Sequence, residues 1–133
     1  MFRGQYSGEI FALQGNSLYR YGLGQSAYVG QFDGVNAVVE YLDGDGNCVA
    51  LAVTNTQVYR LDAYSSQVIE ESVGGVCAAM HYERLFTAKG NKLYYSAPIA
   101  AENWNVATQG AGWIELPLEI GDIVALVSFE EKL

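Results

Sequence analysis

One segment of the sequence is written three times: FALQGNSLYR at residues 11–20, LAVTNTQVYR at residues 51–60 and FTAKGNKLYY at residues 86–95. Each copy is an apolar run, a short turn and a second run of apolar and aromatic residues, and the three copies align without a gap. This pattern is typical of a β-hairpin, whose tight turn favours Gly or Asn at positive φ. We therefore predict three hairpins, with the turn position occupied by Gly15, Asn55 and Gly90.

The segments that flank the hairpins repeat more loosely and supply two further strands for each unit. Apolar runs that end on an aromatic residue suit an innermost strand, where small and β-branched side chains fit a crowded axis. Runs that alternate polar and apolar residues suit an outer strand with one exposed face. The predicted innermost strands are residues 36–41, 76–82 and 123–129, and the predicted outer strands are residues 27–32, 67–73 and 113–118.

Spacings of 40 and 35 residues between the hairpin copies are typical of β-propeller blades of four antiparallel strands. No stretch shows the apolar period of a helix, so we expect an all-β fold. We predict a single domain over residues 1–133 with repeats at about 1–34, 35–74 and 75–120. Residues 121–133 would form the closing strand, because the first repeat lacks an innermost strand of its own.

Three blade equivalents are fewer than the four to eight blades of known propellers. Either two chains pair into a six-bladed ring, or the chain is a piece of a longer propeller. We favour the homodimer, because two-fold pairing is the commonest oligomer and the strands at the two ends of the chain match.

The composition excludes some partners. The chain has 133 residues and a formal net charge of −8, with 15 Asp and Glu against 7 Lys and Arg. Binding to nucleic-acid phosphates needs clustered basic residues, so we expect no nucleic-acid partner. No apolar run approaches the roughly 18 residues of a membrane span, so we expect no membrane partner. The opening residues MFRGQY lack the apolar stretch of a secretory signal, which predicts a cytoplasmic protein or one assembled there.

The third repeat carries a familiar run of residues. Residues 84–98 read RLFTAKGNKLYYSAP, Trp104 follows, and GWIEL at residues 112–116 and GDIVAL at residues 121–126 complete the unit. This run, over roughly residues 76–129, resembles blades of β-propeller proteins encoded by tailed bacteriophages and prophages. The resemblance implies a virion or tail-associated component that is assembled in the cytoplasm and binds other virion or assembly proteins, with no catalytic role.

The irregular stretch from Ser96 to Gly112 is the longest in the sequence and contains Trp104 and Asn105. Long loops are often functional, and an exposed Trp is a frequent anchor for a partner or a sugar ring. The candidate ligand-binding residues, for a carbohydrate or another small ligand, are Trp104, Asn105, Tyr95 and His81. The competing interpretation, which we favour, is that Trp104 folds back onto Tyr94, Tyr95 or Trp113 and caps the blade.

No local motif for catalysis or for a cofactor is present. Only His81 and Glu40 break the apolar pattern of the predicted inner strands, and His81 has no recognisable partner to orient it for catalysis. With no second His, a zinc site with His ligands is not expected. We predict a protein that is not an enzyme; a hydrolase with carboxylates from different blades is the less favoured alternative.

Three further groups have structural interpretations. Asp43, Asp45 and Asn47 match the start of a calcium loop, but Thr54 stands where that loop needs Glu, so we predict a turn in which Asp side chains bind amides. Cys48 and Cys77 lie in apolar runs and are expected to be buried free thiols. The repeated tyrosines are expected to pack between blades, with the following arginines projecting from the opposite face: Tyr19, Tyr59 and Tyr94, and Arg20 and Arg60.

Overall fold

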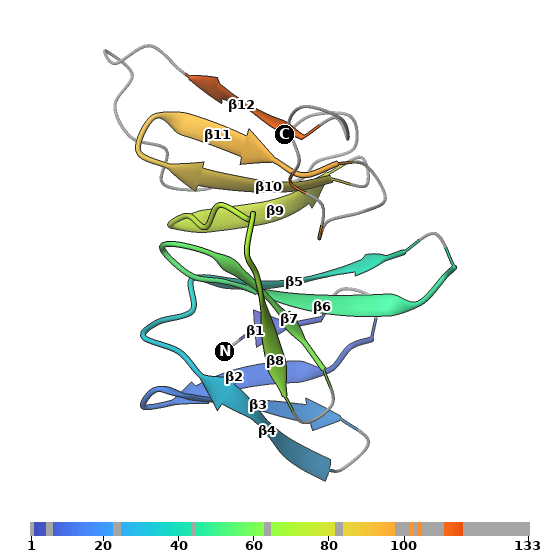
Figure 1. The fold of residues 1–133 in the computed structure, drawn as a ribbon. Coiled ribbons are helices and arrows are strands. Elements are labelled where there is room, and N and C mark those ends of the chain that lie inside the picture. Colours follow the sequence, from blue (N-terminus) through green and yellow to red (C-terminus); the bar gives the residue numbers. More distant parts are fainter. Residues whose placement is uncertain are drawn as a thin grey trace.

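The protein is described by a computed structural model in which residues 2–4, 7–22, 25–43, 45–62, 65–81, 84–97, 102, 104 and 111–115 are placed. Over these residues the fold is all-β, with three four-stranded antiparallel sheets and no helix (Figure 1). The prediction of four-stranded antiparallel units is therefore confirmed, whereas the described strands form no closed sheet. No helix that could cross a membrane is found in this part of the chain.

Each sheet is built from four strands that are consecutive in the sequence. The first sheet contains β1 (Phe2–Arg3), β2 (Ile10–Gln14), β3 (Ser17–Gly22) and β4 (Gln25–Gln31). The second contains β5 (Ala37–Leu42), β6 (Cys48–Val53), β7 (Val58–Leu61) and β8 (Ser66–Ile69). The third contains β9 (Cys77–His81), β10 (Arg84–Lys89), β11 (Lys92–Tyr95) and β12 (Gly112–Glu115).

The three predicted hairpins are the central pairs β2–β3, β6–β7 and β10–β11. Their registers agree with the gap-free alignment, since the equivalent pairs are Leu13 with Leu18, Val53 with Val58, and Ala88 with Leu93. The turn glycines Gly15 and Gly90 have φ values of 63° and 61°, as the hairpin pattern predicts.

The second turn is longer, because no strand residue lies between Val53 and Val58. In that turn the Thr54 hydroxyl donates to the Gln57 carbonyl at 2.9 Å. The Thr54 backbone N–H donates to the same carbonyl at 3.0 Å. These bonds preserve the repeat register at a turn of different composition.

The expectation that the first repeat lacks its own first strand is wrong. Phe2 pairs with Phe11 and Arg3 with Ile10, so β1 occupies the place beside β2 that the sequence assigned to the end of the chain. Phe2 packs against the apolar cluster that contains Phe11, which fixes this short strand in place. The predicted closing segment 121–133, with its strand 123–129, lies outside the described residues.

The sheets stack face to face in chain order, with the second sheet between the other two (Figure 1). One apolar cluster joins the first two sheets through residues such as Phe11, Leu18 and Ala52. A second cluster joins the second and third sheets through Leu51, Val58 and Leu85, among others. Both faces of β6 are therefore buried, which explains its nearly continuous apolar sequence.

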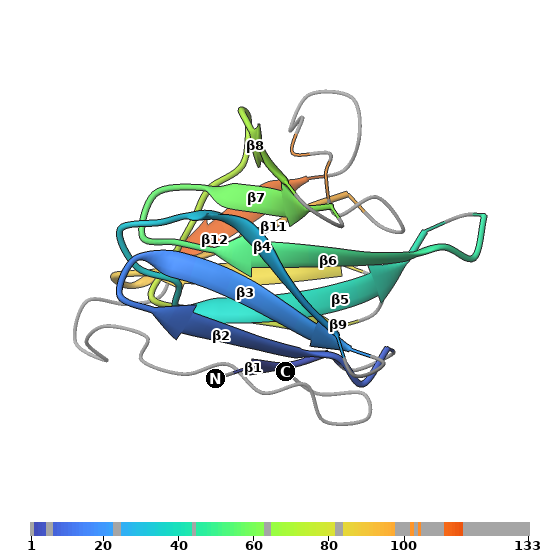
Figure 2. The same ribbon diagram turned by 90° about the horizontal axis from the view of Figure 1, so that it is seen from below.

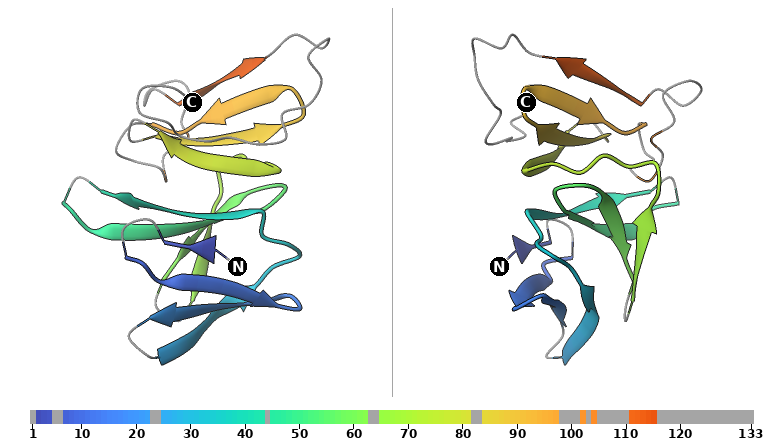
Figure 3. Two further views of the ribbon diagram at one scale, coloured as in Figure 1. Left: turned by 180° about the vertical axis from the view of Figure 1, so that it is seen from behind. Right: turned by 60° about the vertical axis from the view of Figure 1, so that its left-hand side comes forward.

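Neighbouring sheets approach each other most closely along their first strands. Strand β1 contacts β5, and β5 contacts β9. In Figure 2, β1 and β8 lie at opposite edges of the stack, and the oblique views of Figure 3 show the sheets turning relative to one another. The first strands therefore share one edge of the stack.

The two cysteines are free, as expected, but they are not buried. Cys48 is exposed and Cys77 is half-buried. Cys48 is the first residue of β6 and directly follows the turn at residues 43–47, so it lies at the solvent end of the strand and not within its apolar middle.

Candidate binding pocket

An open pocket with a volume of about 490 Å³ lies where the turns of the first two sheets meet. One wall is Asn16 of the β2–β3 turn, and another is the link from β4 to β5 at residues 31–34. The turn at residues 54–56 and Tyr59 of β7 complete it. Two sheets and three loops therefore contribute to one cavity.

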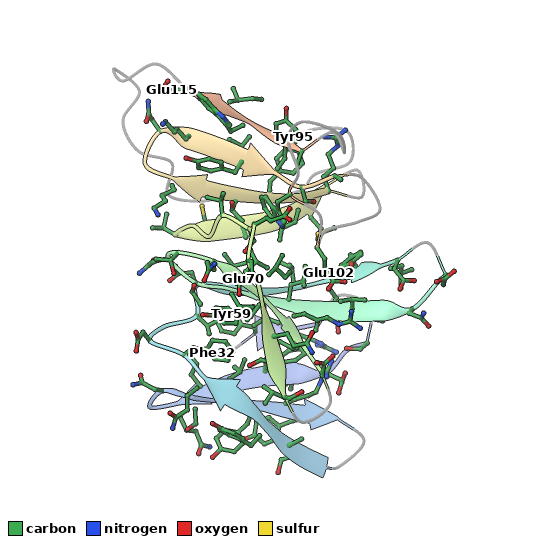
Figure 4. All side chains as sticks on the ribbon, viewed as in Figure 1. Phe32, Tyr59, Glu70, Tyr95, Glu102 and Glu115 are labelled. Carbon is green, nitrogen blue, oxygen red and sulfur yellow. The ribbon has the colours of Figure 1, made fainter. Side chains whose placement is uncertain are left out.

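Two aromatic rings form the base of this pocket. Phe32 and Tyr59 meet edge to face, with ring centroids 5.0 Å apart and an interplanar angle of 83°. Figure 4 shows the two labelled side chains next to each other between the first and second sheets. Phe32 belongs to the cluster between these sheets and Tyr59 packs against that cluster, so the base of the pocket is continuous with the core.

The sequence-predicted site residues do not gather there. Trp104 is only 5% exposed and packs into the cluster between the second and third sheets, against which Tyr94 also packs. An exposed Trp104 ring is therefore ruled out, and its burial near Tyr94 agrees with the alternative in which the ring folds back. Asn105 lies outside the described residues.

Tyr95 lies on the opposite face of the third sheet from Tyr94 and Trp104, because successive strand residues alternate. Its ring lies 5.3 Å from the Arg84 guanidinium and 5.9 Å from the Phe86 ring. His81 ends β9, where its backbone is in register with Arg84, and its side chain is not described. Trp104 and Tyr95 therefore do not form one binding surface.

Glu102, two residues before Trp104, makes an ion pair and a hydrogen bond with the second sheet. The Arg60 guanidinium lies 3.3 Å from the Glu102 carboxylate, which also accepts a 3.0 Å hydrogen bond from the Tyr41 hydroxyl. Burial and the Glu102 carboxylate raise the pKa of Tyr41, and the same carboxylate raises the pKa of Arg60. The network attaches the segment after β11 to the second sheet, with Glu102 near the β5–β6 end in Figure 4.

The repeated arginines both reach across to the next sheet or segment. Arg20 donates to the Asp62 carbonyl at 3.0 Å, pairs with Glu9 at 3.3 Å, and its guanidinium lies 5.1 Å from the Phe11 ring centroid. Arg60 pairs with Glu102 in the equivalent position. Both arginines therefore pair with acidic residues.

The turn after β5 has the structure that the sequence predicts. The Asp43 carboxylate accepts 2.9 Å hydrogen bonds from the backbone N–H groups of Asp45 and Asn47. These bonds lower the pKa of Asp43. Among the residues that are placed, no group of three acidic, His or Cys side chains could hold a metal ion.

Glu40 is a fully buried acidic residue on β5, and its role was not predicted. Its carboxylate accepts a 3.0 Å hydrogen bond from the Ser7 N–H and a second bond from the Ser7 hydroxyl. The available signal in the sequence was that Glu40 interrupts an apolar strand. Its partner Ser7 lies 33 residues earlier, so no local sequence pattern links the two residues. Glu40 thus ties the turn between β1 and β2 to the second sheet.

The chemistry of Cys48 provides a test of this carboxylate. Partial desolvation raises the pKa of the Cys48 thiol, and the charge and hydrogen bonding of Glu40 raise it further. The test is alkylation of Cys48 by iodoacetamide in a Cys77→Ser background. The pH at which the rate is half its maximum should lie above the usual cysteine pKa of about 8.5. Removing the negative charge in Glu40→Gln favours the thiolate, so the midpoint should move to lower pH.

The measurement is the alkylation rate as a function of pH, which separates a pKa change from a general opening of the fold. Opening would raise the rate at every pH, whereas loss of the Glu40 charge moves the midpoint. An unchanged midpoint in Glu40→Gln would show that Glu40 does not influence the thiol.

No protein-family model, curated protein or solved structure matches this chain.

Proposed function

We propose that this chain is a non-enzymatic interaction module whose two end sheets stack against a second copy to complete a six-bladed β-propeller. The observation that carries the proposal is that both end faces of the stack bear the same repeat positions that are buried between the sheets. The contact of β1 with β5 and of β5 with β9 supports a radial arrangement, in which first strands lie nearest the axis.

One end face belongs to the first sheet. Tyr59 packs against the cluster between the first and second sheets, and Tyr94 against the cluster between the second and third. Tyr19 is their repeat equivalent, and its ring instead packs on Tyr28 of the same sheet, with centroids 5.8 Å apart. Tyr28 is 45% exposed and Ile10, on the same face, is 38% exposed. This face therefore presents apolar residues at positions that the next two sheets cover.

The other end face belongs to the third sheet. Phe11, Leu18 and Val29 of the first sheet are almost fully buried against the second sheet. Phe86 and Leu93 are the equivalents of Phe11 and Leu18 in the third sheet, and Ile114, which pairs with Leu93, is 50% exposed. We propose that this end face of one copy packs against the opposite end face of another copy. Two copies would make two such contacts related by a two-fold axis, which closes the assembly.

A place in a phage or prophage particle is the setting we propose for this module. It is supported by the resemblance of residues 76–129 to phage-encoded propellers. Assembly would then take place in the cytoplasm before incorporation into a virion, where other virion proteins are further partners.

The test is the absolute mass in solution over a dilution series. We expect a dimer of about twice the 14.5 kDa of one chain. Ile114→Glu places a charge in the proposed contact and should weaken dimerisation at least tenfold, about 1.4 kcal/mol. Leu42→Glu is the matched control, because Leu42 is 46% exposed but lies on the middle sheet. A folded monomer at every concentration, or equal weakening by both variants, would contradict the proposal.

A further inference from the structure

The pocket between the first two sheets exists because one link departs from its repeat equivalent. In the link from the second to the third sheet, the Gly74 N–H donates to the Thr56 carbonyl at 3.1 Å, and the Gly75 N–H to the Thr54 carbonyl at 2.9 Å. A Cβ on Gly74 would lie 2.2 Å from the Thr54 carbonyl oxygen, so no space remains there.

The link from the first to the second sheet makes the equivalent bond two residues earlier, because the Phe32 N–H donates at 2.8 Å to the carbonyl of Asn16, the repeat equivalent of Thr56. Both links then bond to the next sheet, Asn36 to Val53 and Val76 to Ala88, so residues 33–35 lie in the first link where Gly75 alone lies in the second. A Cβ on Gly34 would meet nothing within 4 Å. The first link is therefore longer by two residues beside the pocket, and Gly34 leaves space there. A position where one repeat differs from the others is a candidate for an added function, because the scaffold itself does not require the difference.

The lining of this pocket has the chemistry of a site for a neutral, hydroxyl-rich molecule. Its polar side chains are three amides, two hydroxyls of threonine, the phenol of Tyr59 and one carboxylate: Asn16, Gln31, Asn55, Thr54, Thr56, Tyr59 and Asp33. Among the residues that the structure describes, no Lys or Arg lines the pocket, and with Asp33 present the electrostatics disfavour an anion. A single carboxylate also gives too few charged ligands for a divalent cation.

Several of the lining residues have side-chain hydrogen-bonding capacity to spare. Asn55 accepts from the Asn36 amide at 2.7 Å through its Oδ1, which leaves its own N–H donors for a ligand. The Asn16, Gln31 and Asp33 residues are exposed, while the half-buried Tyr59 offers an aromatic surface beside the buried Phe32. Paired donors and acceptors around an aromatic surface match a pyranose ring, which has hydroxyls at its edge and C–H groups on its face.

We infer that the pocket bounded by residues 16, 31–34, 54–56 and 59 binds a saccharide unit. Its volume of about 490 Å³ is within the range of small-ligand sites, roughly 300–1,000 Å³. All of its lining residues belong to one chain, so the site does not depend on the proposed assembly. It also lies apart from Trp104 and Tyr95, which face other surfaces.

The experiment is a nitrogen-15 NMR titration of the full chain with the methyl glycosides of glucose, galactose, mannose and N-acetylglucosamine. We expect at least one of them to cause saturable shift changes confined to the backbone amides of the lining residues. Affinity in the millimolar range is expected for a single sugar ring, because so small a ligand makes few contacts. Inorganic phosphate serves as the anionic probe and should cause no such changes.

Two variants locate the site. Asp33→Ala removes a charged acceptor from an exposed side chain and should weaken binding about tenfold or more. Gln67→Ala is the matched control, because Gln67 is exposed on β8 outside the pocket, and its affinity should equal that of the unmodified chain. Absence of saturable shifts with all four glycosides, shifts at other residues, or an equal response to phosphate would each overturn the assignment.

Discussion

Glu40→Ala is expected to lower the free energy of unfolding by about 2–4 kcal/mol. The wild-type carboxylate is fully buried and accepts two hydrogen bonds from Ser7. Hydrogen bonds to a charged group contribute more than neutral ones, and truncation of a buried side chain also leaves a cavity. The loss should be measured by urea denaturation at neutral pH.

The position of Gly4 supports the size of this effect. A Cβ on Gly4 would lie 2.4 Å from a carboxylate oxygen of Glu40, so the backbone packs directly on the carboxylate. Because Ser7 and Gly4 belong to the segment between β1 and β2, loss of the carboxylate should also loosen β1. Faster amide hydrogen exchange at Phe2 and Arg3 is the accompanying result.

Two further variants make this prediction specific. Glu40→Gln keeps the shape and an acceptor but loses the charge, so its cost should be smaller than that of Glu40→Ala. Glu71→Ala removes an exposed carboxylate near the end of β8 and should change stability by no more than about 0.5 kcal/mol. If Glu40→Ala were as stable as Glu71→Ala, the carboxylate would have no role in holding the N-terminal turn.

The hairpins could be predicted because their determinants are local. The register of Leu13 with Leu18 follows from alternating apolar residues and from a turn at Gly15 that tolerates positive φ. Strand β1 could not be predicted, because two residues show no periodicity and its pairing depends on Phe2 reaching the core. The repeat pattern also predicts a strand from the end of the chain in that place.

The candidate site was harder to predict than the fold. An aromatic residue in a long loop gave no means of distinguishing an exposed anchor from a buried cap, and the ion pair between Arg60 and Glu102 joins residues 42 positions apart. The pocket beside Phe32 is formed by three separate loops, so no local motif marks it. A comparison of the links at the 40-residue offset was the available signal, since Asp33 stands where the second link has Val73.

Phe11→Ala is expected to cost about 3–5 kcal/mol of stability, the range for truncating a buried Phe. The Phe11 ring is fully buried between the first two sheets, and the Arg20 guanidinium lies 5.1 Å from its centroid. Truncation removes the apolar contacts together with this cation–π contact. Thermal and urea unfolding should both show the loss, with Arg20 also losing the surface that positions it toward Asp62.

Phe86→Ala applies the same truncation to the repeat equivalent of Phe11 on an end face. Phe86 is half-buried, so at dilutions where the chain is monomeric the cost should be about half that of Phe11→Ala. At concentrations where two copies are paired, the proposed contact covers the Phe86 face, and the cost should rise toward that of Phe11→Ala. A difference between the two variants that did not depend on protein concentration would mean that the end face is not covered by a second copy. The ratio of the two losses in unfolding free energy therefore measures how closely the contact between two chains resembles the stacking of sheets within one chain.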